Sequence, residues 1–517
     1  MNRSLHTIRK QTLQFQYNGN ADSFALQKEV GDWCNFNLIP EIEQQLDLLE
    51  LDDHYFTIDK LEIEATANKN DWQQKIRDEL IFSLKQKLSN YKPKFTEEAG
   101  SKSLTIAWKL DELILYYFEN GYLPWWGKAM IAEDFETVLQ NWIREEMTPL
   151  RAKSIGERLK QTASISQIKR ILYHVPQELF FQLLKNIYKQ EVEIISHTES
   201  FFKEVIVNNI SSTNQKPITK AVYGFILTMM IENEGIINIE VLLQYLHEEV
   251  MKSKVSAKIL KPTATEKIET VANPVKYAWQ KLLIQEIKRQ KKGSKKQHLS
   301  VNEIKFITEQ NQEEKEIAEI AQKENRLQYN KLIDRLTNPD TTKKNKNNLV
   351  AELQEGIYID NAGAVIFAAF IPALFKQLGL EKDGAILNPD LATLIIQYCV
   401  TGNAKITEYE LVLPKILCGL DIEFPVKTKT KISTRQMKEV DEMLLSLIEY
   451  WSVLKNTSID GLRESFFKRS GKLSSMNNEW LLQVEQKPFD MLLQQLPWSI
   501  SMIKLPWMAN LLKTEWV

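Results

Sequence analysis

The sequence predicts a mainly α-helical protein with small α+β elements. Apolar residues recur at helical spacing through most of the 517 residues. Glycine and proline number only 17 and 16, fewer than a turn-rich all-β protein requires. Strict alternation of apolar and polar residues is confined to short segments near the two ends. We therefore expect an N-terminal β-α-β-α unit, a helical middle, a charged linker, and a mainly helical C-terminal domain with a β-hairpin.

Composition narrows the class of protein. The 66 Lys+Arg and 68 Asp+Glu residues nearly cancel, so global charge gives no reason to expect nucleic acid or an anionic membrane as partner. Cys34, Cys399 and Cys418 are far apart and lie among apolar residues, as buried thiols of a reducing compartment do. The sequence shows neither a signal-peptide core nor an apolar run long enough to span a membrane. We expect a cytoplasmic protein.

Residues 1–95 predict the β-α-β-α unit. Apolar and polar residues alternate in Thr12–Tyr17 and again in Tyr55–Ala65, as in half-buried strands. A helical pattern follows each strand, and the first helix should break or kink near Asn37 because Pro40 follows closely. Two strands cannot bury both faces of a sheet, so further strands or a partner subunit should complete it.

Residues 96–250 predict a helical domain. Leu104–Asn120 reads as a helix that ends at Gly121, and the motif GYLPWW follows at once. Trp125 and Trp126 of this motif either cover a core or form an exposed contact, and aromatic pairs favour the core. No fixed repeat period is visible. Seven further helices are expected at 135–147, 148–161, 165–173, 176–188, 192–208, 217–234 and 238–252.

Residues 251–350 predict a charged linker, partly helical or disordered. Its segment Lys288–Lys296, KRQKKGSKK, is strongly basic, and Glu309–Gln328 is acidic and helix-prone. The basic segment could bind nucleic acid or another anion, but no aromatic residue lies between its lysines to stack on bases. A solvated linker is the favoured interpretation.

Residues 351–517 predict the C-terminal domain. We expect a β-hairpin around Asn477 and Asn478, and possible strand pairing at Trp498–Leu505. A short alternating segment, Gly356–Gly363, opens the domain. The expected helices, of which the first is apolar almost all round, are 364–378, 391–400, 408–417, 434–454, 460–467 and 488–496.

No pattern typical of a reaction centre occurs in the sequence. G-x-S-x-G, H-E-x-x-H, paired Cys-x-x-Cys and the P-loop are all absent. His174 follows a helical segment and lies near a turn proline, without a ligand at metal-binding spacing. Arg463 and Glu464 are typical of a salt-bridged helix face. We predict no catalytic, cofactor or metal site, and an enzyme remains only a remote alternative.

Several unusual sequence blocks carry a family resemblance. They are Ile359–Gly363 (IDNAG), Leu454–Leu473 (LKNTSIDGLRESFFKRSGKL), Gln495–Met508 (QLPWSISMIKLPWM) and the GYLPWW motif. In these blocks and in its N-terminal unit the chain resembles the contractile injection system tape measure protein family. The resemblance implies a structural protein of a phage-tail-like particle, with tail tube, sheath or baseplate proteins as partners, and it is compatible with an oligomer. It also implies a tape that sets tube length while tube rings polymerise.

Two functions within such a particle remain open. A single helix of all residues would reach roughly 775 Å, yet the pattern predicts two folded ends joined by a linker that could extend to about 330 Å. The protein could measure the tail, or it could be a non-measuring assembly chaperone, a cap or a baseplate component. The candidate structural or partner-contact residues are Trp125, Trp126, Asn361, Gly363, Asn456, Arg463, Trp498 and Trp507.

Overall fold

The computed structural model describes most of the chain and divides it into two compact units. Described residues are 22–47, 68, 71–89, 101–131, 134–204, 212–252, 275, 278, 279, 282, 312–337, 353–454, 456–476 and 479–516. Unit 1 comprises residues 1–114 and 124–132, and unit 2 comprises 115–123 and 133–517. Both expected N-terminal strands and the basic segment 288–296 lie outside the described residues.

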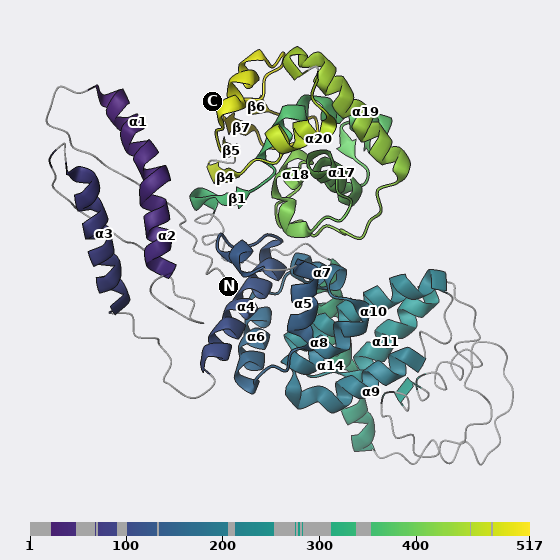
Figure 1. Ribbon diagram of the computed structural model, residues 1–517. Coiled ribbons are helices and arrows are strands. Elements are labelled where there is room, and N and C mark those ends of the chain that lie inside the picture. The colour runs from purple at the N-terminus through teal and green to yellow at the C-terminus, as the bar shows by residue number, and fades with distance from the viewer. Residues whose placement is uncertain are drawn as a thin grey trace. The chain divides into compact units, whose positions relative to one another are not determined.

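Unit 1 contains paired helices with a small core. Helix α1 (Ser23–Trp33) continues through a π-helical turn (Cys34–Leu38) into α2 (Ile39–Asp47), and α2 contacts α3 (Trp72–Ser89) (Figure 1). The π-helical turn lies where the sequence predicted a break, so the chain accommodates Pro40 without ending the helix. The rings of Trp33 and Trp72 meet edge to face, with centroids 4.9 Å apart. Helix α4 (Ser101–Asn120) runs from unit 1 into unit 2.

The first part of unit 2 is a packed helical array, as the sequence predicted. Gly121 ends α4 with φ of +79°, a left-handed conformation that glycine adopts at least cost. Thr148 and Ser164 cap the next helices by accepting hydrogen bonds from the backbone N–H of Arg151 and Gln167. The array consists of α5 (Phe135–Arg144), α6 (Pro149–Thr162), α7 (Ile165–His174), α8 (Phe180–Ile187), α9 (Val192–Phe202), α10 (Ser212–Glu232) and α11 (Ile239–Lys252).

A long helix from the predicted linker joins this array. Helix α14 (Gln312–Thr337) contacts α10 and α11 along its second half, where Tyr329 and Leu332 are buried. Its 26 residues correspond to about 39 Å at 1.5 Å per residue. The described part of the predicted linker is therefore helical and partly built into the folded body.

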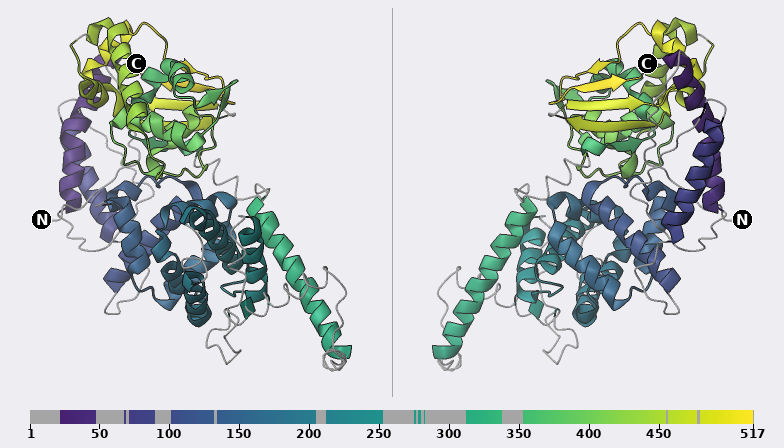
Figure 2. Two further views of the ribbon diagram at one scale, coloured as in Figure 1. Left: turned by 90° about the vertical axis from the view of Figure 1, so that its right-hand side faces the viewer. Right: turned by 90° about the vertical axis from the view of Figure 1, so that its left-hand side faces the viewer.

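The C-terminal part of unit 2 is built on a five-stranded mixed sheet. The sheet order is β1 (Ile357–Ile359), β4 (Gly471–Met476), β5 (Glu479–Val484), β7 (Leu512–Glu515) and β6 (Met502–Ile503). The expected hairpin is β4–β5, with Leu473 opposite Leu482. Strand β7 pairs in parallel with β5 and brings the chain's last residues into the sheet. Helices cover one face of this sheet (Figure 2).

The helices against the sheet contain the largest hydrophobic core. The segment expected as one helix at 364–378 is a 3₁₀-helix, η7 (Ala362–Phe370), followed by α16 (Ile371–Gln377). Pro372 lies in the first turn of α16, where its missing N–H costs no hydrogen bond. The remaining elements are α17 (Pro389–Thr401), η8 (Glu408–Glu410), α18 (Val412–Leu417), α19 (Thr434–Tyr450), η9 (Ser452–Leu454), α20 (Ile459–Leu462), the π-helical η10 (Arg463–Phe467) and η11 (Pro488–Gln495).

Candidate functional site

The family-like blocks meet inside the C-terminal core. Gly363 packs directly on the backbone of η10: a Cβ atom added to it would lie 1.9 Å from the carbonyl oxygen of Phe466. No side chain fits in that space, so the IDNAG and GLRESFF segments can pack this closely only because residue 363 is glycine. Beside it, Asn361 is buried and its Nδ2 donates to Gln397 Oε1 at 2.7 Å and to the carbonyl oxygen of Glu410 at 2.8 Å.

Arg463 ties two of these helices together. Its Nε donates to the carbonyl oxygen of Cys399 at the end of α17, at 3.1 Å. Its two terminal nitrogens pair with Asp460 at 3.2 Å and with Asp441 at 3.3 Å. Asn456, another candidate from the sequence, is exposed just before α20. The arginine thus has the geometry of a structural tie, and its partners are surface carboxylates.

Both Leu-Pro-Trp tryptophans are partly buried and donate inward. Trp498 Nε1 donates to the carbonyl oxygen of Ile366 at 2.7 Å, and Trp507 Nε1 donates to that of Leu417 at 2.7 Å. The ring of Trp507 stacks on Phe375, with centroids 5.4 Å apart. Each indole therefore joins the C-terminal segment to the helical core, while part of each ring stays at the surface.

The GYLPWW motif is split between the two units. Trp125 and Trp126 belong to unit 1 and are half-buried. Lys109 Nζ lies 4.3 Å from the centroid of the Trp126 ring, a cation–π contact within the same unit. Gly121 belongs to unit 2, where it has a separate role at the buried charge cluster described next.

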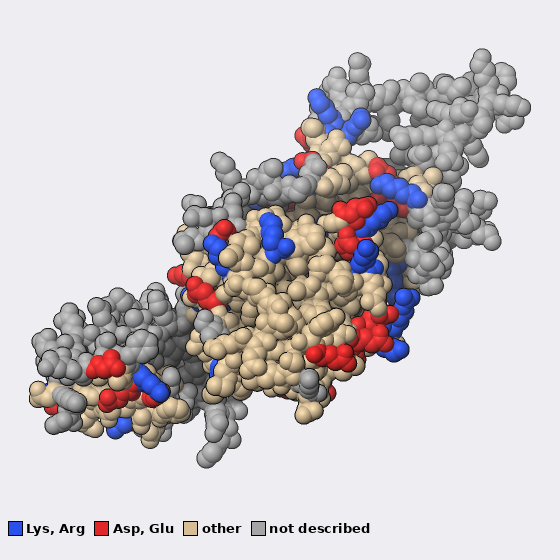
Figure 3. Space-filling model, turned by 90° about the horizontal axis from the view of Figure 1, so that it is seen from above, with Lys and Arg blue, Asp and Glu red and all other residues tan. Residues whose placement is uncertain are grey.

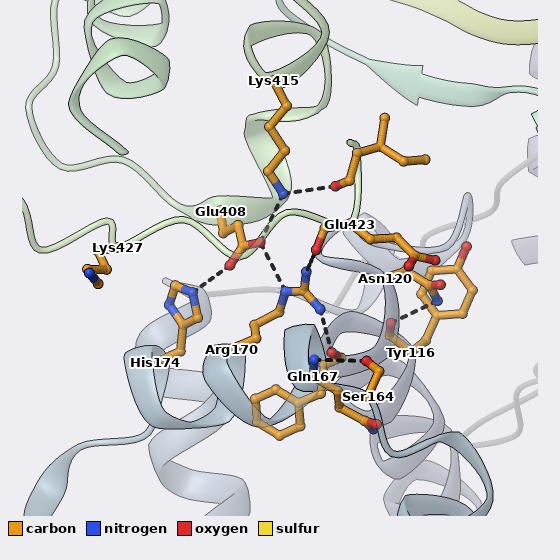
Figure 4. A network of polar contacts seen from close by, with 12 residues as sticks. Tyr116, Asn120, Ser164, Gln167, Arg170, His174, Glu408, Lys415, Glu423 and Lys427 are labelled. Carbon is orange, nitrogen blue, oxygen red and sulfur yellow. Dashed lines mark hydrogen bonds and ion pairs between the residues drawn. The ribbon is translucent and has the colours of Figure 1, made fainter. Parts of the chain in front are cut away.

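A largely buried charge cluster connects the helical array to the C-terminal part of unit 2 (Figure 4). Glu408, at the start of η8, accepts hydrogen bonds from Arg170 Nε at 3.0 Å and from Lys415 Nζ at 2.9 Å through one oxygen. Its other oxygen lies 2.7 Å from His174 Nε2. The side chains of Arg170, Glu408 and Lys415 are all fully shielded from solvent. We call these four residues the buried charge cluster.

Backbone carbonyls accept further hydrogen bonds from the two cations of the cluster. Arg170 also donates to the carbonyl oxygen of Phe118 at 2.6 Å and to that of Glu423 at 2.5 Å. Lys415 donates its second hydrogen bond to the carbonyl oxygen of Ile422 at 3.0 Å. The cations are thereby paired with one carboxylate and three carbonyl dipoles, as buried charges must be.

Electrostatics inside the cluster follow from one carboxylate facing several cations. Burial by itself raises the pKa of Glu408, but the charges of Lys415 and Arg170 and the hydrogen bond with His174 outweigh it and hold the pKa well below its usual range. Burial lowers the pKa of Lys415 to about 8, because Glu408 compensates the lysine only in part and Arg170 repels it. Glu408 is therefore a firmly ionised group, unlike a general acid poised near neutral pH.

Gly121 leaves room for the cluster. A Cβ atom at this position would lie 2.7 Å from Arg170 Nη2 and 2.7 Å from Glu408 Oε1. Its positive φ and this close approach both favour glycine. The turn that follows α4 is thus shaped to fit around the charge cluster.

A second buried ion pair lies under the C-terminal sheet. Arg469 is fully buried and pairs with Asp490, with Nη1 and Oδ2 3.3 Å apart and a second, closer contact through Nη2. Trp516 Nε1 donates to the same carboxylate at 3.0 Å. Arg469 also donates to the carbonyl oxygens of Ser465 at 2.8 Å and of Glu485 at 3.1 Å. This pair anchors η11 and the chain's last strand to η10.

A cavity of about 330 Å³ adjoins the buried charge cluster. His174 and Glu408 contribute to its wall, which Tyr117, Phe135, Leu139, Ile406 and Ile432 make largely apolar. Lysines 405 and 429 at its edge are paired with Asp134 at 3.1 Å and with Glu136 at 3.3 Å. The cavity wall also contains Thr407, Thr428 and Thr430.

The residues that the structure describes contain no group of three or more His, Cys, Asp or Glu placed to hold a metal ion. No helix among them is both long and apolar enough to cross a membrane. Cys34, Cys399 and Cys418 are free and buried, as the sequence predicted.

Sequence reasoning missed the two buried ion pairs. Arg170 and Glu408 are 238 positions apart in the chain, so no local spacing connects them. Gly121 was the usable signal in the sequence. Its place after a helix correctly indicated a cap, but only the fold shows that it also leaves room for the buried charge cluster. His174 was noted for its isolation in sequence, and the structure gives it a carboxylate partner.

The described fold consists of helical units and a small mixed sheet, and buried ion pairs hold its segments together. The chain matches the family described as contractile injection system tape measure protein over residues 5–516, and it therefore belongs to that family. This confirms the resemblance seen in the sequence blocks, and such a family points away from catalysis. No curated protein and no solved structure is detectably similar to the chain.

Proposed function

We propose that this protein takes part in assembling the tail of a phage-tail-like contractile particle and governs the length of its tube and sheath. The observation that carries the proposal is the match to the tape measure family along almost the whole chain. Tube, sheath or baseplate proteins would be its partners, and its place would be in the cytoplasm while particles assemble. The described structure supports a role that depends on the shape of the folded protein, because its buried polar clusters hold the folded segments together.

The fold limits which part of the chain could act as a length standard. Trp279 packs on Phe201 at 5.9 Å between ring centroids, and α14 begins at Gln312, so both flanks of residues 283–311 belong to folded structure. These 29 residues could extend to about 95 Å at roughly 3.3 Å per residue. Stretching the regions of unit 2 that hold Arg170–Glu408 or Arg469–Asp490 would instead separate buried charges at a cost of several kcal/mol each.

The direct test changes the length of residues 283–311. Deleting 20 residues from this stretch shortens the possible span by about 30 Å if it is helical and about 66 Å if it is extended. Insertion of 20 residues of matched composition should lengthen particles by the same amount, measured on electron micrographs. A variant with residues 286–305 in scrambled order is the matched control, and its particle length should be unchanged. Unchanged lengths in both the deletion and the insertion variants would refute measurement by this stretch.

A second function is favoured by the compactness of the described body. A non-measuring assembly chaperone, cap or baseplate component needs a folded surface, and unit 2 provides one closed by two buried ion pairs. Quantitative mass spectrometry of purified particles separates the two. A chaperone is absent from finished particles, whereas a tape or cap is present at a fixed copy number.

A further inference from the structure

The cavity beside the buried charge cluster is lined by polar groups that the fold leaves unused. Within the part of the chain that the structure describes, no hydrogen bond is formed by the hydroxyls of Tyr117, Thr428 and Thr430 or by Nδ1 of His174. Lys431, also in the wall, has no carboxylate within ion-pair distance there. Polar groups in a protein interior are normally hydrogen-bonded, so this set of unused groups indicates that a molecule from outside the chain satisfies them.

His174 and Tyr117 are held firmly in the cavity wall. Glu408 is ionised and can only accept hydrogen bonds, so Nε2 of His174 donates to it across 2.7 Å. The second ring nitrogen points away from Glu408 (Figure 4). The side chain of His174 is only 10% exposed, and its ring meets that of Tyr117 edge to face, with centroids 5.6 Å apart. The site is therefore preformed, which lowers the entropic cost of binding.

The remainder of the wall is apolar and encloses enough room for a small molecule. Phe135, Leu139, Ile406 and Ile432 line it, and all four are buried. An apolar cavity of about 150 Å³ accepts benzene, so by proportion this cavity of about 330 Å³ accepts roughly a dozen non-hydrogen atoms. That volume lies within the range of small-molecule sites. Water alone would leave this apolar wall without a matching partner.

The exposed rim of the cavity has an excess of positive charge. Lys405 and Lys429 are neutralised by Asp134 at 3.1 Å and by Glu136 at 3.3 Å. Lys431 is exposed at the same rim without such a partner among the described residues. The carboxylate of the buried charge cluster already accepts from its own cations and cannot neutralise this lysine.

Two more lysines lie beside residues of the wall. Nζ of Lys220 is 4.0 Å and Nζ of Lys427 is 5.3 Å from the centroid of the Tyr173 ring, which precedes His174 in α7. Lys427 is paired with Asp390 at 3.7 Å, whereas Lys220 has no carboxylate partner in the described structure. On the face of unit 2 drawn in Figure 3, by contrast, lysines and carboxylates lie near one another at the edges. Positive charge is thus concentrated beside the cavity.

We propose that this cavity binds a small amphiphilic anion, with an apolar group of about eight carbon atoms inside and a carboxylate neutralised by Lys431. The hydroxyls of Tyr117, Thr428 and Thr430 and the ammonium group of Lys431 can all donate hydrogen bonds, so they select a ligand rich in acceptors. The apolar wall selects the hydrocarbon part. Such a carboxylate belongs either to a free acid or to the C-terminus of a chain that ends in an apolar residue.

The experiment is a calorimetric titration of the full chain with octanoate. Octanol, which has the same chain length without the charge, is the comparison ligand. The wild-type protein should bind octanoate with a Kd below about 1 mM, as expected for a ligand of this size. Octanol should bind at least about tenfold more weakly, because it loses the charge-assisted hydrogen bonds.

Two variants with matched controls locate the binding site. Tyr117→Phe removes a hydroxyl without a partner in the protein, so it should leave the melting temperature unchanged and weaken octanoate binding at least about threefold. Tyr122→Phe is its control: Tyr122 is also buried with an unpartnered hydroxyl, but it does not line the cavity. Lys431→Met should weaken octanoate binding by a similar factor, whereas Lys376→Met, at an exposed lysine outside the cavity wall, should not.

A blocking variant and two peptides complete the test. Thr430→Phe should fill the cavity and abolish binding; if it does not fold, Tyr117→Phe and Lys431→Met decide. A pentapeptide ending in leucine, with a free or an amidated C-terminus, separates the two sources of the carboxylate. Once octanoate binds, tighter binding of the free-carboxylate peptide assigns the site to a chain end, and failure of both peptides assigns it to a free acid.

Three results would overturn the proposal. The first is the absence of saturable octanoate binding up to about 5 mM. The second is equal affinity for octanoate and octanol, since the charge would then not be recognised. The third is undiminished binding to both Tyr117→Phe and Lys431→Met, which would place the octanoate elsewhere on the protein.

Discussion

Replacing Glu408 by glutamine tests whether the buried charge cluster holds unit 2 together. The substitution preserves size and removes the only carboxylate among the described residues that forms an ion pair with Arg170 and Lys415, both fully shielded from solvent. Breaking a buried ion pair by removing one partner costs about 3–5 kcal/mol, because the remaining charge is left uncompensated. Two cations lose their partner here, so we expect a loss at the upper end of that range.

The assay is equilibrium unfolding in urea, followed by intrinsic fluorescence. Glu408→Gln should lower the transition midpoint markedly, whereas Glu157→Gln should change the free energy of unfolding by less than about 0.5 kcal/mol. Glu157 is the matched control because its partner, Lys153, lies 3.9 Å away and both side chains are largely exposed.

A triple replacement of the cluster separates charge from shape. Changing Arg170 to Met, Glu408 to Leu and Lys415 to Met removes all the buried charge at once, and apolar replacements of this kind are often neutral in stability. The triple variant should regain most of the stability lost by Glu408→Gln. The reasoning is refuted if Glu408→Gln costs less than about 1 kcal/mol, or if the triple variant is the least stable of the set.

Three further predictions address acid sensitivity and close packing. Because the pKa of Glu408 is lowered in the folded protein, its stabilising contribution is present above about pH 4.5 and is lost as pH falls towards the folded-state pKa; the stability gap between wild type and Glu408→Gln should therefore narrow below pH 4.5, and a constant gap contradicts this. Gly363→Ala places a methyl group against the Phe466 carbonyl and should cost at least about 1–3 kcal/mol in thermal or urea unfolding, whereas Gly31→Ala, with open space around it, should be neutral or slightly stabilising; equal effects would exclude the packing argument. Trp507→Ala should destabilise by about 3 kcal/mol through lost ring packing and a lost hydrogen bond, and a fully stable variant would show that the ring is dispensable.

Sequence patterns predicted the helices well because the spacing of apolar residues within each helix reflects which of its faces is buried. Seven helices of the array and the β4–β5 hairpin lie within a few residues of their expected positions, since 3.6-residue and two-residue periods are local properties. The apolar segment 364–378 was harder: residues buried on every side give no periodicity that distinguishes a 3₁₀-helix from an α-helix. The five-stranded sheet was also missed as a whole, because β1 and β7 come from opposite ends of the C-terminal region.

The charged residues of the site could not be predicted for a different reason. Arg170, Glu408 and Lys415 look like ordinary surface residues in sequence, and only the fold shows that they share one dry contact. From sequence alone, a lysine or a glutamate is assigned to the surface because these residue types are usually exposed. The exceptions are pairs made by tertiary structure, and their two members lie far apart along the chain.

The sequence blocks that mark the family are also places where a glycine packs closely against another backbone segment, or where a side-chain hydrogen bond joins two segments. A Cβ atom at Gly363 would contact the Phe466 carbonyl, and one at Gly419 would lie 2.5 Å from the Trp507 carbonyl. Contacts this close restrict which residue types fit at these positions. The blocks are therefore evidence of the fold, and not by themselves of a binding partner. The block at Gln495–Met508 differs, because its tryptophans are tied inward while its uncharged residues stay at the surface. That combination gives the segment two structural features: its indoles close the C-terminal core, and several of its uncharged side chains remain exposed.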